Sequence, residues 1–371
     1  MKIGITCYPT YGGSGAVATE LGIALGQRGH EVHFVTYKQP FRLPTFLPRV
    51  FFHEVDVGRY PLFEFPPYDL ALAVRMHEVV REHRLDVLHC HYAIPHATSA
   101  WIAKQMLREE QRDIRVVTTL HGTDITIVGQ DPSYQTITKF SIEKSDALTA
   151  VSNYLQRETL TAFGCTACRI EVIPNFIDPE VYNRDRWHGS LRPQFDGGRR
   201  VLMHISNFRA VKRVCDIVRM FAKVTREVPS VLIMVGDGPD RALAEQEARN
   251  LGVESSVRFL GKIDSVAPLL AAADLFVLLT DAESFGLSAL EALASGTPVI
   301  GTRAGGLPEV VRDGETGVLC GVGDVEGAAQ AAIDLLRNQD RWTHMSRTAI
   351  ADARERFSKD DIVERYEQMY V

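Results

Sequence analysis

The sequence has no long uninterrupted hydrophobic run, since no segment approaches the roughly 18 apolar residues that a membrane-spanning helix needs. Its first residues, MKIGITCYPTYGG, pass from a short apolar run into a glycine loop. They show no hydrophobic region followed by a cleavage site, so a secretory signal peptide is not expected. We therefore expect a cytoplasmic protein without a membrane span.

Cysteine is scarce, with six residues spread over positions 7, 90, 165, 168, 215 and 320. This spread is unlike the dense frameworks of small secreted domains, so reduced thiols are expected. Cys165 and Cys168 form a CxxC pair, but no second pair of ligands follows at the spacing of a structural zinc site. A metal or redox role for this pair is therefore not favoured.

An excess of positive charge is also missing, because 41 Lys and Arg face 47 Asp and Glu, for a net charge of -6. Nucleic acids bind mainly through clustered cations, so a nucleic-acid partner is not expected. A local basic patch can still hold a small phosphate. The 371 residues suit two domains of about 150 to 200 residues, which implies a cleft.

Short apolar runs alternate with helix-length segments through both halves, as a parallel sheet with crossover helices requires. The first half contains KIGITC, EVHFVTY, DVLHCH, RVVTTLH and ALTAVS, and the second contains RVLMHIS, SVLIMVGDG, SVRFLG, LFVLLT and TPVIGT. The pattern predicts an α/β fold of two Rossmann-like domains facing each other across a cleft. The predicted division is an N-terminal acceptor domain at 1–172, a linker at 173–199, a C-terminal nucleotide-sugar domain at 200–345, and a helical segment at 346–371 that could cross back to the N-terminal domain.

Two polar turns follow strands of the first half. Glycines and serine at 12–15 open a helix directly after the first strand, where free N–H groups and the helix dipole favour an anion. A simple tight turn explains this loop about equally well. His121 begins the quartet HGTD at the end of a later strand, where ligands of open α/β sheets bind. It either donates a hydrogen bond to a substrate hydroxyl or is satisfied by local carbonyls.

Three histidines lie within the segment HCHYAIPH at 89–96. A zinc site is not favoured there, because no third ligand at a suitable position is identifiable and packing explains these residues as well. Tyr92 is the better candidate for a ligand contact.

Two segments of the second half are suited to a nucleoside diphosphate. SNFRAVKR at 206–213 ends a strand with cations that can neutralise a leaving diphosphate, although a solvated basic turn is the alternative. Glu283 and Glu291 bracket a loop-to-helix turn, and the N–H groups of residues 285–288 can hold phosphate oxygens. One carboxylate can then accept bonds from a hexose and the other from a ribose.

Together with VGDGP at 235–239 and GGLPEVVRDGETG at 305–317, these motifs resemble the family 4 retaining glycosyltransferases of the GT-B fold over nearly the whole chain. The resemblance implies that Glu291 binds the uridine ribose and Glu283 meets the transferred sugar. The implied catalytic residues are His121, Arg209, Lys212 and Glu283. The implied donor-binding residues are Gly13, Asn207, Arg213, Phe285, Gly286, Leu287, Ser288 and Glu291, and the acceptor candidates are Ser14, Tyr92, Thr119 and Arg209.

Three stretches, HYAIPHA at 91–97, TTLHGTDIT at 118–126 and ISNFRAVKR at 205–213, resemble a synthase subgroup of that family. The subgroup moves N-acetylglucosamine from UDP-N-acetylglucosamine (UDP-GlcNAc) to the 2-hydroxyl of L-malate in the first step of bacillithiol biosynthesis. Many relatives separate the phosphate Arg and Lys by five residues, whereas Arg209 and Lys212 are three apart. Arg213 could therefore share the role of Lys212.

The resemblance implies a front-face reaction, in which a donor phosphate oxygen takes the acceptor proton and anomeric configuration is retained. No DxD-like carboxylate cluster ends a strand, so no metal or cofactor is expected beyond the UDP-sugar and a small dicarboxylate acceptor. The alternatives are a transferase of the same fold with another acceptor, a UDP-GlcNAc 2-epimerase, and a non-catalytic nucleotide-sugar sensor. The sequence leaves open the oligomeric state, including a homo-oligomer, and the degree of domain closure.

Overall fold

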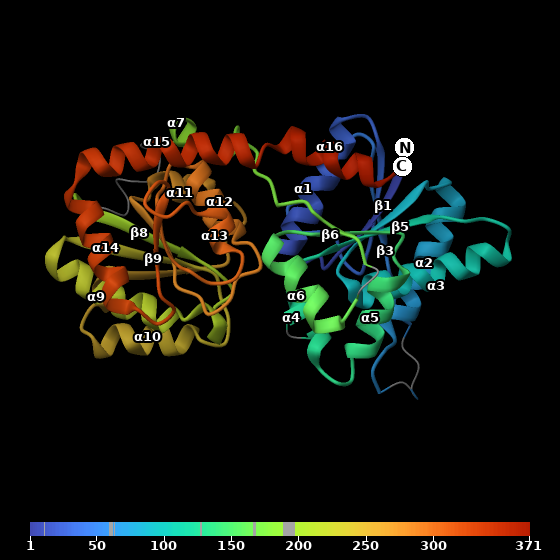
Figure 1. Ribbon diagram of the computed structural model, residues 1–371, viewed down its shortest axis with the longest axis horizontal. Helices are drawn as coiled ribbons and strands as arrows, with labels where there is room; N and C mark the ends of the chain where they lie inside the picture. Colours follow the sequence, from blue (N-terminus) through green and yellow to red (C-terminus); the bar gives the residue numbers. More distant parts are fainter. Residues whose placement is uncertain (11, 59–61, 63, 127, 166–167, 188–196) are drawn as a thin grey trace. The chain divides into compact units, whose positions relative to one another are not determined.

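The computed structural model describes residues 1–371 apart from 11, 59–61, 63, 127, 166–167 and 188–196. The chain forms two compact units (Figure 1). The first unit contains Met1–Asn175 and Lys359–Val371, and the second contains Phe176–Ser358. Residues 188–196 of the predicted linker lie outside the described residues, and the predicted domain boundaries stay a prediction.

The first unit is built on a seven-stranded parallel sheet with the order β3-β2-β1-β4-β5-β6-β7. This order reverses direction between β1 and β4, the topological switch point where α/β sheets bind ligands. The strands are β1 (Lys2–Thr6), β2 (Glu31–Thr36), β3 (Val50–Glu54), β4 (Val87–His91), β5 (Arg115–Leu120), β6 (Ala147–Ala150) and β7 (Ile170–Val172).

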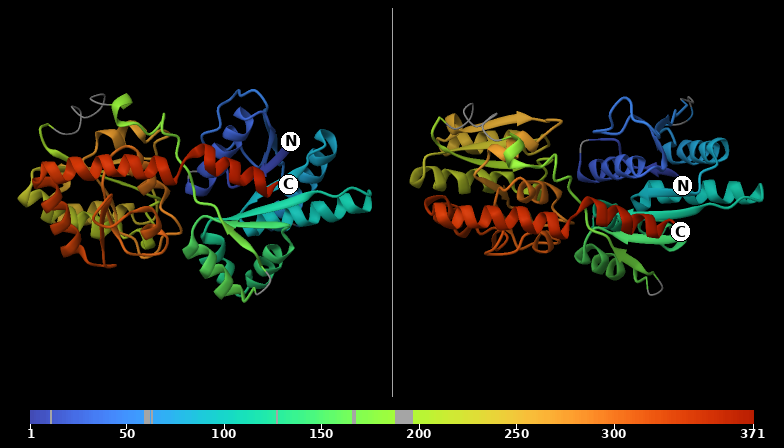
Figure 2. Two further views of the ribbon diagram at one scale, coloured as in Figure 1. Left: turned by 45° about the horizontal axis from the view of Figure 1, so that its top comes forward. Right: turned by 90° about the horizontal axis from the view of Figure 1, so that it is seen from above.

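Helices cover both faces of this sheet (Figure 2). They are α1 (Gly13–Gln27), α2 (Tyr68–His83), η1 (Ala93–Ala97), α3 (Thr98–Glu109), α4 (Thr123–Thr126), η2 (Val128–Gln130), α5 (Gln135–Lys144), α6 (Asn153–Phe163) and α16 (Lys359–Met369). Because both faces are covered, the central strands are buried along their length, and all five residues of β4 are buried.

The second unit repeats this plan with a six-stranded parallel sheet in the order β10-β9-β8-β11-β12-β13. Its switch point lies between β8 and β11. The strands are β8 (Arg200–Ile205), β9 (Ser230–Val235), β10 (Val257–Gly261), β11 (Leu275–Leu278), β12 (Val299–Thr302) and β13 (Gly317–Cys320). The two sheets confirm the α/β fold expected from the alternating pattern.

The helices of the second unit are α7 (Arg184–Trp187), η3 (Ala210–Lys212), α9 (Val214–Glu227), α10 (Arg241–Asn250), η4 (Glu254–Ser256), α11 (Ala267–Ala272), α12 (Leu287–Ala294), α13 (Leu307–Val310), α14 (Val325–Arg337) and α15 (Gln339–Arg356). The core packs α9 and α14 against the strands through fully buried side chains such as Phe221 and Ile217. No helix among the described residues has the length and apolarity to cross a membrane.

The C-terminal segment is two helices, because α15 ends at Arg356 and α16 begins at Lys359. Within the first unit, α16 lies beside α1 (Figure 1). Arg365 donates to the carbonyl of Val172 at 2.5 Å, and the ring of His30 is hydrogen-bonded to Glu367 at 2.7 Å. These two bonds join the last helix to β7 and to the loop between α1 and β2.

The expectation of reduced thiols is wrong for one pair, since Cys165 and Cys168 form a disulfide directly after α6. Their Cα atoms lie 5.5 Å apart, within the range that a disulfide spans. Cys7 and Cys90 are free and buried, while Cys215 and Cys320 are free and half-buried.

Candidate active site

In the second unit, two loops leave neighbouring strands at the switch point. The first follows β8 and carries residues 206–213, and the second follows β11 and carries residues 279–286. The carbonyl oxygen of Val211 accepts a hydrogen bond from the N–H of Asp281 at 2.9 Å and another from the hydroxyl of Thr280 at 2.8 Å. These bonds hold the two loops together.

The two joined loops bring the predicted catalytic residues Lys212 and Glu283 into contact. The Nζ atom of Lys212 lies 2.5 Å from Oε2 of Glu283, and both side chains are only about one-sixth exposed, at 17% and 16%. A charge-assisted hydrogen bond in this partly desolvated position is stronger than a surface ion pair. The pair therefore places a cation and a carboxylate side by side at the carboxyl edge of the sheet.

The other two cations of this loop differ in their partners. Arg213 donates to Asp281 at 2.8 Å and is also paired with Asp216, and these two bonds raise the pKa of its guanidinium. Arg209 is exposed, and no carboxylate within the described part of the chain pairs with it. Arg209 is thus free to meet an anion, whereas Arg213 already has two carboxylate partners.

Glycines of two other motifs give the loops room to approach. A Cβ atom on Gly236 would overlap the carbonyl oxygen of Ser206, and one on Gly305 would overlap the backbone of Glu283. Both glycines have positive φ, of 121° and 59° respectively, which favours glycine. The N–H of Gly306 donates to the carbonyl of Glu283 at 2.6 Å. The VGDGP and GGLPE motifs therefore shape the backbone around the predicted donor residues.

The remaining donor candidates surround the start of α12. Gly286 precedes the helix with a φ of 100°, and Leu287 and Ser288 form its half-buried first turn. Phe285 is buried, with its ring edge-on to Phe357 at 5.7 Å. Its side chain therefore packs inward, which leaves only its backbone for a donor contact.

Glu291 lies on α12 and is only 4% exposed. The Tyr182 hydroxyl donates to its Oε1 atom at 2.5 Å. The remaining donor candidate, Asn207, is exposed on the loop after β8.

In the first unit, the loops after β1, β4 and β5 also gather at the switch point. The side chains of Ser14 on α1 and Thr123 on α4 act on the Tyr92 hydroxyl and partly oppose the rise of its pKa. Burial, with a contribution from the charge of Asp124, raises the pKa of Tyr92 to about 12. Tyr92 is thus a protonated hydrogen-bond donor at neutral pH. Gly13 is exposed at the start of α1, next to Ser14.

Buried histidine side chains pack beneath these loops. Nε2 of His121 is hydrogen-bonded to Nδ1 of His91 at 2.8 Å, and their rings stack at 5.1 Å. On the same strand, His89 is hydrogen-bonded to Thr119 at 2.7 Å and to the Tyr370 hydroxyl at 2.8 Å. Burial lowers the pKa of both His89 and His121 to about 3, so these rings are neutral at pH 7.

Thr119, predicted to contact the acceptor, is fully buried, and its hydroxyl is hydrogen-bonded to His89 and Thr149. The structure therefore brings His121, Tyr92 and Ser14 to the edge but leaves Thr119 beneath it. The side chain of a strand residue can be buried in the core or can face a ligand. Its position in the sequence does not distinguish these two cases.

Comparison with known proteins places this geometry in a family. Residues 11–181 match Glycosyltransferase Family 4, and residues 186–355 match Glycosyl transferases group 1. The chain is 50% identical over 371 residues to N-acetyl-alpha-D-glucosaminyl L-malate synthase of Bacillus anthracis, covering 100% of this chain and 96% of that protein. This chain belongs to glycosyltransferase family 4.

A more distant relative and two solved structures also resemble this chain. D-inositol 3-phosphate glycosyltransferase of Mycobacterium bovis is 29% identical over 356 residues, which cover 88% of this chain and 71% of that one. The structure of sucrose-phosphate synthase from Thermosynechococcus elongatus superposes with a TM-score of 0.80 at 22% identity, over 100% of this chain and 98% of that one. Anabaena HepE in complex with UDP and glucose gives a TM-score of 0.79 at 21% identity, over 100% and 99%. The fold is GT-B.

Two residues that organise these loops were not predicted from the sequence. Asp124 is 2% exposed, and its carboxylate accepts bonds from the N–H groups of Ala93 and Gly122 at 3.0 Å, which joins the loops after β4 and β5. Its place in the HGTD quartet was a usable signal. Tyr182, the partner of Glu291, lies in an irregular stretch that gave no signal.

The histidines of segment 89–96 have protein partners. His96 is hydrogen-bonded through Nδ1 to the carbonyl of His91 at 2.6 Å, in addition to the bonds of His89 and His91 described above. Within the described residues, they are not part of the group of potential metal ligands that the structure gathers. That no metal binds at this segment stays a prediction.

Proposed function

We propose that this protein transfers N-acetylglucosamine from UDP-GlcNAc to the 2-hydroxyl of L-malate, with retention at the anomeric carbon and release of UDP. The observation that carries the proposal is the 50% identity to the Bacillus anthracis synthase over all 371 residues. The site chemistry supports it, because a UDP-sugar needs cations for its diphosphate and carboxylates for its hydroxyls. The proposal includes a cytoplasmic location and no requirement for a cofactor.

The Lys212–Glu283 pair supplies both kinds of group to the donor. With the donor bound, Lys212 and Arg209 neutralise the diphosphate, and Glu283 accepts hydrogen bonds from the sugar hydroxyls. Cations held where charge develops on the leaving group stabilise the transition state, with effects of about 10² to 10³ in rate for one lost donor. Arg213 orients the loop through Asp216 and Asp281 and has a smaller share in neutralising the phosphate.

The remaining donor contacts fall to the start of α12. The N–H groups of residues 285–288 bind phosphate oxygens, with Gly286 allowing their close approach. Glu291, oriented by the Tyr182 hydroxyl, accepts from the ribose. Gly13 and Asn207 complete the donor set as exposed backbone and amide contacts.

In the front-face reaction, the bond between the anomeric carbon and the diphosphate oxygen breaks as the malate hydroxyl oxygen bonds to the same face of that carbon. The hydroxyl proton passes to the departing phosphate oxygen, so no protein nucleophile is required. His121 is neutral and has one ring nitrogen bonded to His91, so its other nitrogen can hydrogen-bond to the sugar's primary hydroxyl.

Different residues would bind the carboxylates of the acceptor and its hydroxyl. The free N–H groups at the start of α1, with Ser14, suit one malate carboxylate. Tyr92 donates a hydrogen bond, and Arg209 offers a second carboxylate partner. Thr119 acts indirectly in this proposal, by orienting His89 beneath the edge.

The deciding experiment measures UDP release from UDP-GlcNAc by the purified protein, with and without L-malate, and records the product mass. Malate-dependent release with a glycosylated malate is the expected result. Consumption of UDP-GlcNAc without malate would instead indicate an epimerase, release only with another acceptor would indicate a different transferase, and tight donor binding without turnover would indicate a sensor. The same assay after EDTA treatment is expected to show unchanged activity, and a loss restored by magnesium would contradict the metal-free mechanism.

A further inference from the structure

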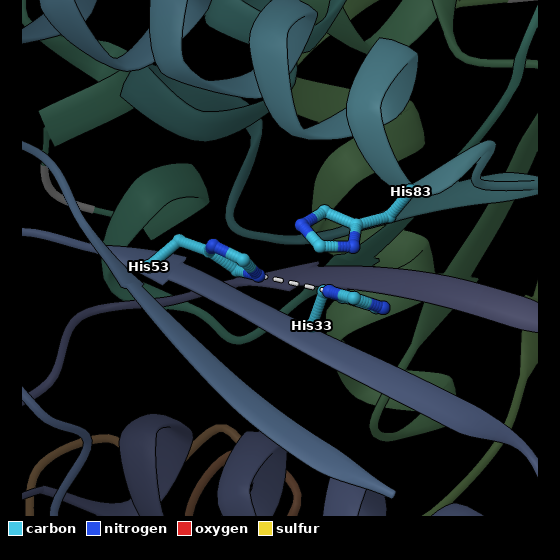
Figure 3. A group of neighbouring side chains, drawn as sticks. All are labelled: His33, His53 and His83. Atoms are coloured by element: carbon cyan, nitrogen blue, oxygen red, sulfur yellow. Dashed lines mark hydrogen bonds between the residues drawn. The ribbon is translucent and has the colours of Figure 1, made fainter.

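Three imidazoles meet at the β2–β3 edge of the first unit, away from the loops described above. They come from β2 (His33), β3 (His53) and the last residue of α2 (His83), and Figure 3 shows their rings turned toward one another. Nδ1 of His33 lies 2.8 Å from Nε2 of His53, and one ligand atom from each of the three residues lies within 4.8 Å of the others. We propose that His33, His53 and His83 form a binding site for a zinc-class transition-metal ion.

The strand register explains why two of the rings meet. His33 pairs with Phe51 and Val35 pairs with His53, so His53 lies two residues beyond the direct partner of His33, on the same face of the sheet. The third ring comes from α2, the helix that covers this face and ends at His83. A tetrahedral zinc ion holds its nitrogen ligands about 3.4 Å apart, so small side-chain rotations bring these atoms to that spacing.

A carboxylate fixes the orientation of the buried ligand. The opposite ring nitrogen of His33, Nε2, lies 3.0 Å from Oε1 of Glu31, which is itself held by Lys2 at 3.0 Å. Because an ionised carboxylate only accepts, Nε2 carries the proton and Nδ1 presents its lone pair toward His53. Metal-binding histidines are characteristically oriented by such a carboxylate, so Glu31 is a positioning residue of the proposed site.

The charged groups around the three rings do not oppose a bound cation. The neighbouring cations have carboxylate partners, with Lys2 on Glu31 and Arg75 on Glu78 at 3.0 Å. Three imidazoles suit Zn²⁺, Cu²⁺ and Ni²⁺, whereas Mg²⁺ and Ca²⁺ prefer oxygen ligands. Water would complete a tetrahedral zinc coordination. The ion would join the end of α2 to β2 and β3, so it is expected to stabilise the unit without entering the transfer reaction.

The direct test titrates the full chain, first freed of metal with EDTA, with Zn²⁺ in a calorimeter and with Co²⁺ by visible absorption. We expect one equivalent of each ion to bind, tetrahedral bands for Co²⁺, and a higher unfolding temperature with Zn²⁺. The substitutions His53→Ala and His83→Ala are expected to abolish the bands. Glu31→Gln is expected to weaken binding about tenfold, in the range typical of carboxylates that orient metal ligands.

His344→Ala, which changes an exposed histidine of α15, is the matched control and should bind like the wild type. Circular dichroism shows whether each variant is folded, independently of transfer activity. Absence of cobalt bands in the wild type, or equal binding by wild type and folded His83→Ala, would overturn the proposal. Since the readouts are binding and stability, these results stand apart from any outcome of the malate assay.

Discussion

The two units share the order of their first six strands but carry different kinds of side chain at their switch points. In the second unit, the loops hold ionised groups in pairs, Lys212 with Glu283 and Arg213 with Asp281 and Asp216. In the first unit, the corresponding loops hold rings whose pKa burial lowers, as for His121, to about 3. The same fold therefore presents ion pairs at one sheet edge, and at the other it presents neutral rings together with the single buried carboxyl of Asp124.

The difference follows from what each edge has to bind in the proposed reaction. The negative charge on the diphosphate grows as this group leaves the sugar, so cations must be close to it. When no donor is bound, the carboxylate partners neutralise these cations. A neutral ring instead orients a hydroxyl without competing for the diphosphate. Sheet topology thus selects the place of the site, and the side chains on the loops select its chemistry.

Removing the Lys212–Glu283 ion pair of the second unit should have the largest effect on kcat/KM. Lys212→Ala removes a cation from the diphosphate and leaves the largely buried Glu283 without that partner, so kcat/KM is expected to fall about 10² to 10³-fold. Steady-state UDP release measures this change. The control is Lys223→Ala, which removes an exposed ion pair with Glu326 at 2.6 Å and should leave kcat/KM unchanged. Equal effects of the two substitutions would refute a special role for Lys212.

The loops of the first unit contain the buried carboxyl of Asp124, whose titration should make the free energy of unfolding depend on pH. Burial raises the pKa of the Asp124 carboxyl to about 6, although bonds from Ala93 and Gly122 partly oppose the shift. The folded state therefore binds this proton more tightly than the unfolded chain. The resulting stabilisation is fully present below about pH 4 and is lost as pH rises through about 6.

Asp124→Asn removes this titration. The free energy of unfolding of wild type minus that of the variant should fall by up to about 3 kcal/mol between pH 4 and pH 7. Denaturant titrations can follow Trp101 of the first unit in a background where Trp187 and Trp342 are replaced by Phe. A difference that stays constant with pH would contradict the raised pKa, and exposed Glu109→Gln is the control.

Replacing His121 should lower turnover without changing the affinity for the donor nucleotide. His121→Ala removes a hydrogen bond expected at the transferred sugar, so kcat should fall about 10- to 100-fold while UDP affinity, set by the second unit, stays the same. Single-turnover kinetics and UDP titration measure the two quantities. Unchanged kcat would remove His121 from the catalytic set. His77→Gln, on α2, serves as the control.

The sequence predicted the parts of this comparison that depend on local pattern. Alternating apolar runs identified both sheets, and glycines and cations directly after strands identified the donor loops, because parallel strands bring their carboxyl ends to one edge. The resemblance to family 4 and the proposed reaction class were confirmed by the relatives. The individual site roles remain predictions.

What the sequence did not predict depends on contacts between distant residues. His33, His53 and His83 are separated by 20 and 30 residues, so no ligand-spacing motif reveals them. Thr119 was assigned to the acceptor, although it is fully buried and bonded to the neighbouring strands β4 and β6. The partner of His89, Tyr370, lies 281 residues away. Only the folded backbone brings such residues together.

The hydrogen bond between Tyr370 and His89 tests how far the buried histidines of the first unit influence catalysis. Tyr370→Phe removes the hydroxyl bond to Nδ1 of His89 at 2.8 Å, where both side chains are buried. A net cost of about 1 kcal/mol in the first unit is expected, with kcat changed less than about threefold, because the hydrogen bonds of His89 go to Tyr370 and Thr119 and not to His121. Tyr134→Phe, at a half-exposed tyrosine, is the control for stability. If Tyr370→Phe instead lowered kcat as much as His121→Ala, the buried imidazoles would have to act as one unit with the catalytic ring, and the first unit's chemistry would extend to the end of the chain.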